Sequence, residues 1–455
     1  MYKNYLSAKV GVLSEESKRN GCIFVSQNSK LMKKMNRKTG WAGCVAGLLS
    51  LMACSQPEEQ FFPAWQEGEM EIHHIYTGRG ESNFMIFPDG TSLLVDVGDW
   101  DPSDYPKMCE PLPDASRRAG SWVARYVNRV NPHQNEVDYL LVSHFHNDHT
   151  GDSTLPVPRT EDQDPNYALV GITEAGQSLR FGHVLDRGYP DYQYPLPIQD
   201  PDVTNYRAFL QNQQRQYGLQ QEPFVVGQEN QIALQHDRSK YQSRFSIRNL
   251  AANGEVWTGP TGETRCFYDL NEANLDPQRQ NENTKSIALR IAYGPFRYYC
   301  GGDISGQLLD EKGQPVNVEE QVALACGPVD VCKTNHHAYK DAMTEGFIRH
   351  TQARQYVIPV WDYEHIQPAV IQRMVSETPA SDDPVVFPTC LPQQLQAQYA
   401  AEPWMQSVAP VSGHVVIKVF DEGRKYRIYV LSACDERMQV QRVYGPYESR
   451  GLSNE

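Results

Sequence analysis

The residues with the clearest chemistry lie in one short segment, His144-Phe-His-Asn-Asp-His149. It places three imidazoles and the carboxylate of Asp148 within six residues. Imidazole nitrogens and carboxylate oxygens are ligands that zinc prefers and that iron and manganese accept. His144 and His146 would hold one ion, while Asp148 and His149 face a second. The segment therefore predicts a site for one or two ions, with zinc expected first.

Strands must present this segment. Residues 137–143 form a nearly continuous apolar run, which is typical of a strand buried on both faces. Shorter runs over 71–76, 83–87 and 92–98 predict earlier strands, and a helix is expected near 120–130. The alternative is a polar loop whose histidines only cap a following helix. The full spacing argues against that alternative.

The His-x-His-x-Asp-His pattern is similar to the signature of the metallo-β-lactamase-fold hydrolases. The preceding strand, which ends in Asp96-Val-Gly98, also resembles the corresponding strand of that family. The resemblance implies an α/β fold, a four-layer αββα sandwich with the metal site at the open end of its two sheets. It also implies that Asp96 orients a metal ligand from behind.

The downstream half extends the resemblance. Two predicted strands, 286–293 and 296–300, lead to Gly301-Gly-Asp303, and Asp303 resembles the family's bridging aspartate. The alternative for Asp303 is an ordinary turn residue. A strand over 329–335 leads to His336 and His337. Adjacent side chains at a strand end do not both face one ion, so His336 is expected to be the ligand and His337 to stand beside it as a catalytic residue.

The last histidine of the series is His365, which follows a predicted strand over 356–359. It is expected in the pocket, where it would stabilise a substrate oxyanion or phosphate oxygen; the alternative is a cap of the helix over 367–375. This order of motifs resembles the extracellular hydrolase domain of DNA-uptake channel proteins and the bacterial choline-phosphate esterases. The resemblance covers about residues 70–152 and 281–375.

One feature departs from the family pattern. Fuller sites of this fold carry a third histidine for the first ion before the bridging aspartate, and its place here falls near Asn283. Asparagine is a poor zinc ligand, so Asn283 is expected behind the ligands. His183 is an alternative third ligand, although a structural histidine on a strand is the favoured interpretation. The chain is therefore expected to hold one ion tightly and another loosely.

Composition narrows the class of partner. The 455 residues include 42 Lys and Arg against 56 Asp and Glu, a net charge of −14, and 40% are hydrophobic. This is a globular composition. Acidic balance argues against nucleic acid as a partner, because binding phosphates needs a basic face.

The N-terminus reads as a targeting segment. Residues 1–53 contain nine Lys or Arg and two Glu, and a basic run over 33–38 precedes an apolar run that ends at Leu51-Met-Ala-Cys54. This order resembles a bacterial lipoprotein signal peptide, whose lipidated cysteine, here Cys54, becomes the mature N-terminus. Translation starting at Met32 or Met35 is the alternative to the first methionine. The mature protein is then expected on the bacterial cell envelope, anchored to a membrane by lipid.

The rest of the chain divides by composition. Residues 54–69 form a polar tether, 70–375 the hydrolase domain, and 376–455 a proline-rich connection with two strands over 413–420 and 425–431. These strands either complete the sandwich or form a small appended sheet. Between the metal motif and Asp303, residues 154–280 are expected to be a long tyrosine-rich insertion that lines a substrate cleft or merely covers the surface.

Two classes of function fit these residues. The first is a zinc-dependent hydrolase of a small-molecule, glycan or phosphoester substrate, in which an activated water attacks an ester or phosphodiester bond. Asp148 would orient that water, and His365 and His337 would assist. The alternative is a non-catalytic, metal-stabilised surface-binding lipoprotein. A nuclease acting on single-stranded nucleic acid is a second alternative, which the charge balance disfavours.

Overall fold

Strand β4 (Glu136–Val142) buries side chains on both of its faces, as its apolar run predicts. Tyr139 and Leu141 point into an apolar core shared by two sheets, whereas Leu140 and Val142 point into a second core that helices cover. Successive side chains of a strand point to opposite faces, so one strand can serve both cores. Strand β4 therefore contributes to both the core between the sheets and the core beneath the helices.

The computed structural model describes residues 60–100, 107–259, 263–267, 282–306, 308–309, 315–378 and 384–451. These residues belong to one compact unit, Glu59–Glu455. The predicted signal segment and lipidated Cys54 lie outside the described residues. Within the described ranges, no helix has the length and apolar character needed to cross a membrane.

The first sheet has nine strands. Its parallel part runs from β3 to β6, and its other neighbours pair antiparallel. In spatial order the strands are β19 (Val440–Glu448), β18 (Lys425–Leu431), β17 (His414–Phe420), β1 (Met70–His74), β2 (Asn83–Ile86), β3 (Ser92–Val95), β4, β5 (Arg180–Asp186) and β6 (Gln220–Pro223).

The second sheet has eight strands and is also mixed. It is parallel from β11 to β16 and antiparallel elsewhere. In spatial order the strands are β16 (Val385–Pro388), β15 (Gln355–Ile358), β14 (Val331–Lys333), β11 (Phe296–Gly301), β10 (Ala288–Tyr293), β7 (Phe245–Ala252), β8 (Glu255–Trp257) and β9 (Thr264–Cys266). A separate pair is formed by β12 (Leu308–Leu309) and β13 (Pro315–Val316).

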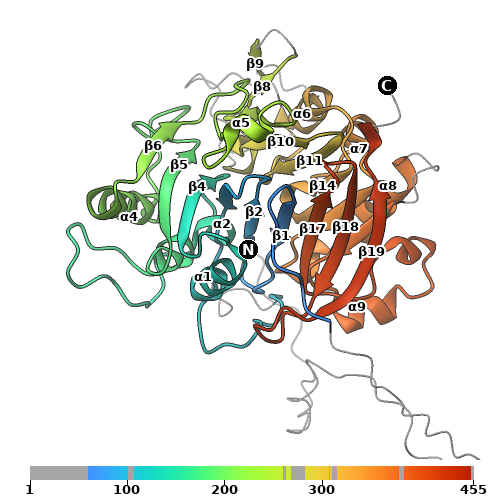
Figure 1. Ribbon diagram of the computed structural model, residues 1–455, viewed down its shortest axis with the longest axis horizontal. Coiled ribbons are helices and arrows are strands. Elements are labelled where there is room, and N and C mark those ends of the chain that lie inside the picture. The colour runs from blue at the N-terminus through green and yellow to red at the C-terminus, as the bar shows by residue number, and fades with distance from the viewer. Residues whose placement is uncertain are drawn as a thin grey trace, which may run out of the picture. The chain divides into compact units, whose positions relative to one another are not determined.

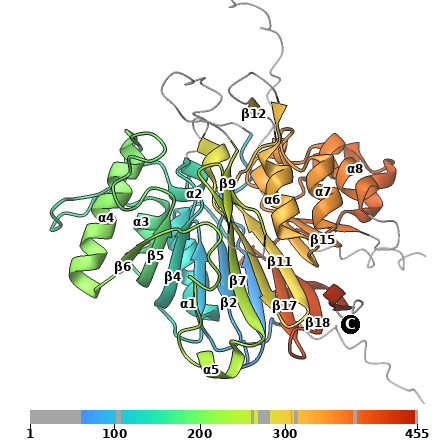
Figure 2. The same cartoon turned by 90° about the horizontal axis from the view of Figure 1, so that it is seen from above.

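Helices cover the outer face of each sheet (Figures 1 and 2). The first sheet is covered by α1 (Ala119–Val130), α3 (Gly171–Ala175) and α4 (Pro201–Tyr217), and the second by α6 (Val318–Cys326), α7 (Glu345–Thr351) and α8 (Pro368–Glu377). The shorter helices are α2 (Asn147–Thr150), α5 (Arg238–Tyr241), α9 (Gln393–Gln398), η3 (Glu282–Lys285), η4 (Asn335–Ala338), η5 (Tyr363–His365) and η7 (Pro403–Ser407). The structure confirms the α/β class with two packed sheets.

Residues 154–280 differ from the expected insertion. The segment supplies β5 and β6 to the first sheet and β7, β8 and β9 to the second. Two of its tyrosines, Tyr192 and Tyr206, are buried, and both hydroxyls donate to Asp186 at 2.9 and 3.2 Å. These two tyrosines therefore pack into the helix-covered core and do not line an open cleft. The expectation and the structure differ because these strands pair with partners far away in the sequence, which a local pattern does not encode.

The C-terminal strands complete the first sheet, so one of the two alternatives for 376–455 is selected. Strand β17 pairs with β1, the first strand of the fold, from Met70 with Val419 to His74 with Val415. Strand β19 then adds the edge. Strand β1 therefore lies between β2, its neighbour in the sequence, and β17 from the C-terminal part of the chain.

Histidines buried in this core predict loss of stability in acid. His414 accepts a hydrogen bond from the Tyr76 backbone N–H at 3.0 Å, and burial, with His73 nearby, lowers its pKa to about 3. Burial likewise lowers the pKa of His74 to about 3. Below pH 6.5 the unfolded chain takes up protons that the folded chain does not bind. Each histidine therefore removes about 1 kcal/mol of unfolding free energy per pH unit from 6.5 towards 3.

Urea unfolding of wild type and His414→Asn between pH 4 and 7 checks this expectation. Asparagine keeps an acceptor for the Tyr76 N–H but does not titrate, so the variant should show the shallower pH slope. Parallel slopes for the two proteins would contradict it.

Candidate metal centre

The site forms where strands from both sheets end at one edge of the sandwich. Asp96 follows β3, His144 follows β4, Asp303 follows β11 and His337 follows β14. Loops beyond the carboxyl ends of parallel strands are where α/β folds commonly place ligand sites. Side chains far apart in the chain therefore meet here.

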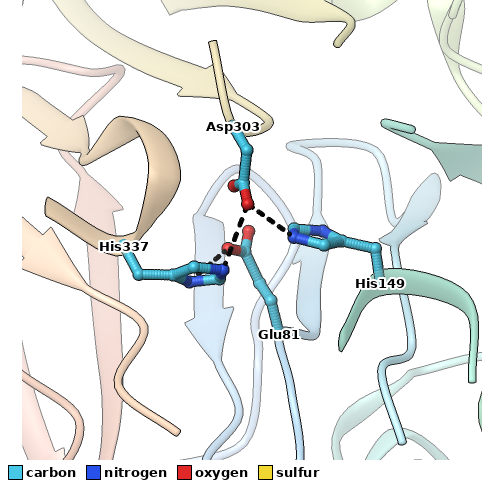
Figure 3. A group of neighbouring side chains, drawn as sticks. All are labelled: Glu81, His149, Asp303 and His337. Carbon is cyan, nitrogen blue, oxygen red and sulfur yellow. Dashed lines mark hydrogen bonds and ion pairs between the residues drawn. The ribbon is translucent and has the colours of Figure 1, made fainter. Parts of the chain in front are cut away.

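Four buried side chains converge at this edge, Glu81, His149, Asp303 and His337 (Figure 3). Each offers one ligand atom, and these atoms all lie within 4.8 Å of one another. Asp303 Oδ2 lies 3.2 Å from His149 Nε2 and 3.4 Å from His337 Nε2. Figure 3 shows the side chains pointing towards one another from separate segments. The cluster could hold a metal ion.

Asp148 lies beside the same cluster of side chains. Its Oδ2 lies 3.0 Å from His337 Nε2 and 3.5 Å from His149 Nε2. Asp148 and His149 both sit on α2, the single turn that follows the His-x-His motif. Two imidazoles and two carboxylates thus face one point, which is a donor set suited to zinc, iron or manganese.

His144 also approaches Asp303, and His146 lies next to His144. His144 Nε2 is 3.8 Å from Asp303 Oδ2 and 3.2 Å from His146 Nδ1. Asp303 Oδ2 therefore faces three imidazoles, those of His144, His149 and His337. Its second oxygen, Oδ1, is buried and has no hydrogen-bond partner among the described residues. A buried carboxylate oxygen without a partner is costly, and a cation at this point would satisfy it.

The structure brings His337, not His336, into the cluster. Both residues have positive φ, 43° and 49°, and this left-handed turn directs the two rings differently. His336 Nδ1 lies 2.7 Å from Asp341 Oδ1, and its Nε2 lies 3.2 Å from Asn283 Nδ2. The expected order of ligand and neighbour is reversed here, because the local turn, not the strand alternation, sets the direction of each ring. Asn283 contacts His336 from η3 and is not in the cluster.

His365 packs against the back of the cluster. Its ring stacks on His337 with centroids 4.5 Å apart and planes inclined by 14°. Burial, reinforced by the neighbouring His337, lowers the pKa of His365 well below its usual value, so the ring is neutral. Its Nδ1 is buried without a hydrogen-bond partner among the described residues. His365 therefore lies where it can exchange a hydrogen bond with a group bound at the cluster.

Hydrogen bonds from behind fix the direction of His149. Its Nδ1–H donates to Asp96 Oδ2 at 2.8 Å, which leaves Nε2 facing the cluster. Asp96 is itself held by the backbone N–H and hydroxyl of Ser143, at 2.8 and 2.6 Å. A carboxylate behind a histidine fixes its tautomer and raises its basicity towards a metal.

Close backbone packing seats the motif loop. Gly98 lies so near Asp148 that a Cβ atom would stand 1.9 Å from the Asp148 carbonyl oxygen. The Glu81 N–H donates to that same oxygen at 2.8 Å, and the Val97 N–H donates to the His149 carbonyl at 2.9 Å. Only glycine fits at position 98 without displacing Asp148.

Two residues that the sequence analysis did not identify support the site from below. Lys333, fully buried at the end of β14, forms an ion pair with Glu81 at 2.9 Å. Its Nζ also donates to the carbonyls of Gly301 and Gly302, at 2.7 and 3.3 Å, just before Asp303. Glu81 Oε2 in turn lies 3.4 Å from His337 Nδ1. Neither Glu81 nor Lys333 belongs to a recognisable motif. The only signal in the sequence is that Lys333 is a single lysine in an otherwise apolar strand.

This geometry makes Glu81 a positioning group more than a ligand. The ammonium of Lys333 neutralises its carboxylate and would repel a cation beside it. Glu81 faces Nδ1 of His337, together with the Pro359 carbonyl at 3.0 Å, while Nε2 faces Asp148. His337 is thus oriented in the same way as His149.

The electrostatics of the cluster favour positive charge. Burial would lower the pKa of His337, but the carboxylates of Asp303 and Asp148 outweigh it and raise that pKa to about 9. The same carboxylates, with Asp96, raise the pKa of His149 well above its usual value despite its burial. The imidazoles in turn outweigh burial at Asp303 and hold its pKa well below the usual range. Protons therefore compete with a metal for this site, and metal affinity should fall as pH falls.

His183 does not join the site. It lies on β5, with Nδ1 2.7 Å from Glu222 Oε1 and its ring stacked on Tyr139 at 5.1 Å. It therefore does not replace the missing third histidine.

Comparison of the sequence with protein-family models and with curated proteins finds no match in either.

Removing the shared carboxylate should weaken metal binding. Asp303→Asn takes away the negative charge that faces His144, His149 and His337, so bound zinc, measured by elemental analysis after dialysis, should fall below wild type. Asp152→Asn is the matched control, because Asp152 is also buried near the motif loop but accepts from Thr154 instead. Equal zinc content in the two variants would contradict the assignment.

The Glu81–Lys333 pair should behave as one unit. Glu81→Gln leaves the buried Lys333 without an anion and should cost about 3–5 kcal/mol of unfolding free energy. Combining it with Lys333→Met removes the stranded charge and should recover part of that loss. Denaturant unfolding of both single variants and the double variant measures the coupling, and strictly additive costs would argue against a paired role.

Proposed function

We propose that this protein is a zinc-dependent hydrolase of the metallo-β-lactamase type, held on the bacterial cell envelope by a lipid on Cys54. The observation that carries the proposal is the convergence of His149, His337, Asp148 and Asp303 on one buried point, where Asp303 Oδ1 has no hydrogen-bond partner among the described residues.

Architecture supports the family assignment in this proposal. Two mixed sheets pack between helices, and the motif loops leave both sheets at the same edge. The hydrolase family places its metal ligands at that edge of a similar sandwich. The envelope location rests on the basic and apolar runs before Cys54.

The chain's own residues divide the work as follows. A bound zinc would supply Lewis acidity and a water of lowered pKa. Asp148, whose Oδ2 contacts both cluster imidazoles, is placed to accept a proton from the attacking group. The neutral His365, stacked on His337, is placed to donate a hydrogen bond to the oxygen that gains charge. Asp96 and Glu81 keep His149 and His337 aimed at the reacting centre.

The bond cleaved in this proposal is an ester or a phosphodiester. The order Gly-Gly-Asp303, then His336-His337, then His365 resembles the phosphoesterase-like branch of the family more than the lactamases. Fold alone assigns no substrate, so the motif order carries this choice.

A hydrolysis screen tests the proposal. Zinc-loaded protein is assayed against bis(p-nitrophenyl) phosphate, p-nitrophenyl acetate and a chromogenic cephalosporin. Turnover is expected with the phosphodiester or the ester, and His149→Gln should reduce it by more than about 100-fold, beyond the loss typical of groups behind a ligand.

His183→Gln is the matched histidine control, since His183 is bonded to Glu222 away from the cluster. It should retain wild-type turnover. Zinc-loaded protein that hydrolyses none of the ester or phosphodiester probes would overturn the hydrolase proposal, and equal losses in the two variants would overturn the placement of the site.

A further inference from the structure

Two cysteines from distant parts of the chain border the segment that forms one wall of the metal centre. The Cys109 N–H donates to the Trp361 carbonyl at 2.8 Å, next to a bridge between Met108 and Asp362. On the same segment, the Thr389 N–H donates to the Ile358 carbonyl at 3.0 Å, which places Cys390 alongside.

The two thiols are neighbours. The side chains of Cys109, Cys390 and Tyr76 lie near enough for each to alter the pKa values of the other two. Both cysteines carry free thiols in the structure, Cys109 buried and Cys390 half-buried. The backbone contacts to residues 358–362 hold both cysteines beside the same segment.

We propose that Cys109 and Cys390 form a disulfide when the protein meets a small disulfide oxidant such as oxidised glutathione. The more accessible Cys390 thiolate attacks one sulfur of the oxidant and releases one thiolate, which leaves a mixed disulfide on Cys390. The Cys109 thiol loses its proton and attacks the Cys390 sulfur, which releases the second thiolate. Two protein thiols are oxidised, one disulfide reagent is reduced to two thiols, and the two protons go to the released thiolates.

The surroundings suit these two roles. The hydrogen bond from Cys109, with a second from Tyr76, lowers the pKa of Cys390 against the effect of burial. The same hydrogen bond to Cys390, with burial, raises the pKa of Cys109. Cys390 is therefore the attacking group and Cys109 the resolving one.

The disulfide would restrain residues 358–362, which lie beside the metal centre. Trp361 Nε1 lies 3.4 Å from His337 Nε2, and the rings of Trp361 and His365 meet at 4.9 Å. A bond between Cys109 and Cys390 would tie the segments on both sides of Trp361 together. This inference does not depend on the hydrolase proposal, because it concerns only the thiols and the chain around them.

Peptide mapping of the full-length protein tests the inference. Protein is incubated with oxidised glutathione, unfolded, blocked with iodoacetamide and digested without reductant. A linked peptide pair that contains Cys109 and Cys390, lighter by about 2 Da than the sum of the two free peptides, is expected. The pair should vanish in Cys390→Ser and persist in Cys326→Ser, in which a different buried thiol is changed.

Thermal unfolding gives a second readout. After incubation with oxidised glutathione the wild type should melt at a higher temperature than before it, Cys326→Ser should keep that difference, and Cys390→Ser should lose it. Carbamidomethyl labels on both Cys109 and Cys390 after oxidation would overturn the inference. A link from either residue to a different cysteine would overturn it as well.

Discussion

The buried carboxylates of Asp148 and Asp303 are the constraint on which the rest of this structure depends. An anion in a dry interior is strongly unfavourable unless cations or hydrogen-bond donors face it. His149 and His337 face both carboxylates and hold raised pKa values for that reason. One oxygen of Asp303 still lacks a partner among the described residues. A metal ion would satisfy that oxygen and replace the protons on the imidazoles.

The fold meets this constraint by giving the imidazoles and Glu81 hydrogen-bond or ion-pair partners behind them. Asp96 holds His149 from behind, and Glu81 and the Pro359 carbonyl hold His337. Lys333 then neutralises Glu81 and bonds the two glycine carbonyls that precede Asp303. The same lysine thus links both sheets' contributions to the site, because Glu81 precedes β2 and Asp303 follows β11.

Much of this arrangement was predictable from local pattern. The apolar run of 137–143 identified a strand buried on both faces, and the motif after it placed His144, Asp148 and His149 at a strand end. The class of two packed sheets with helices was implied by the resemblance of that motif to a known family, and the structure bears out the α/β class. The segment 154–280 was not predictable as strands of both sheets, because the partners with which its strands pair are set by the packing of the whole chain.

The sequence by itself determined which residue types could bind a metal and that they follow predicted strands, since ligand chemistry and strand periodicity are local properties. The tertiary structure alone decided which of them meet. It turned His337 inward and His336 towards Asp341 through a left-handed turn, and it brought in Glu81 and Lys333, which carry no motif. It also placed Cys109 beside Cys390. Backbone dihedrals in turns and contacts between distant segments depend on the packed chain, so no local pattern specifies them.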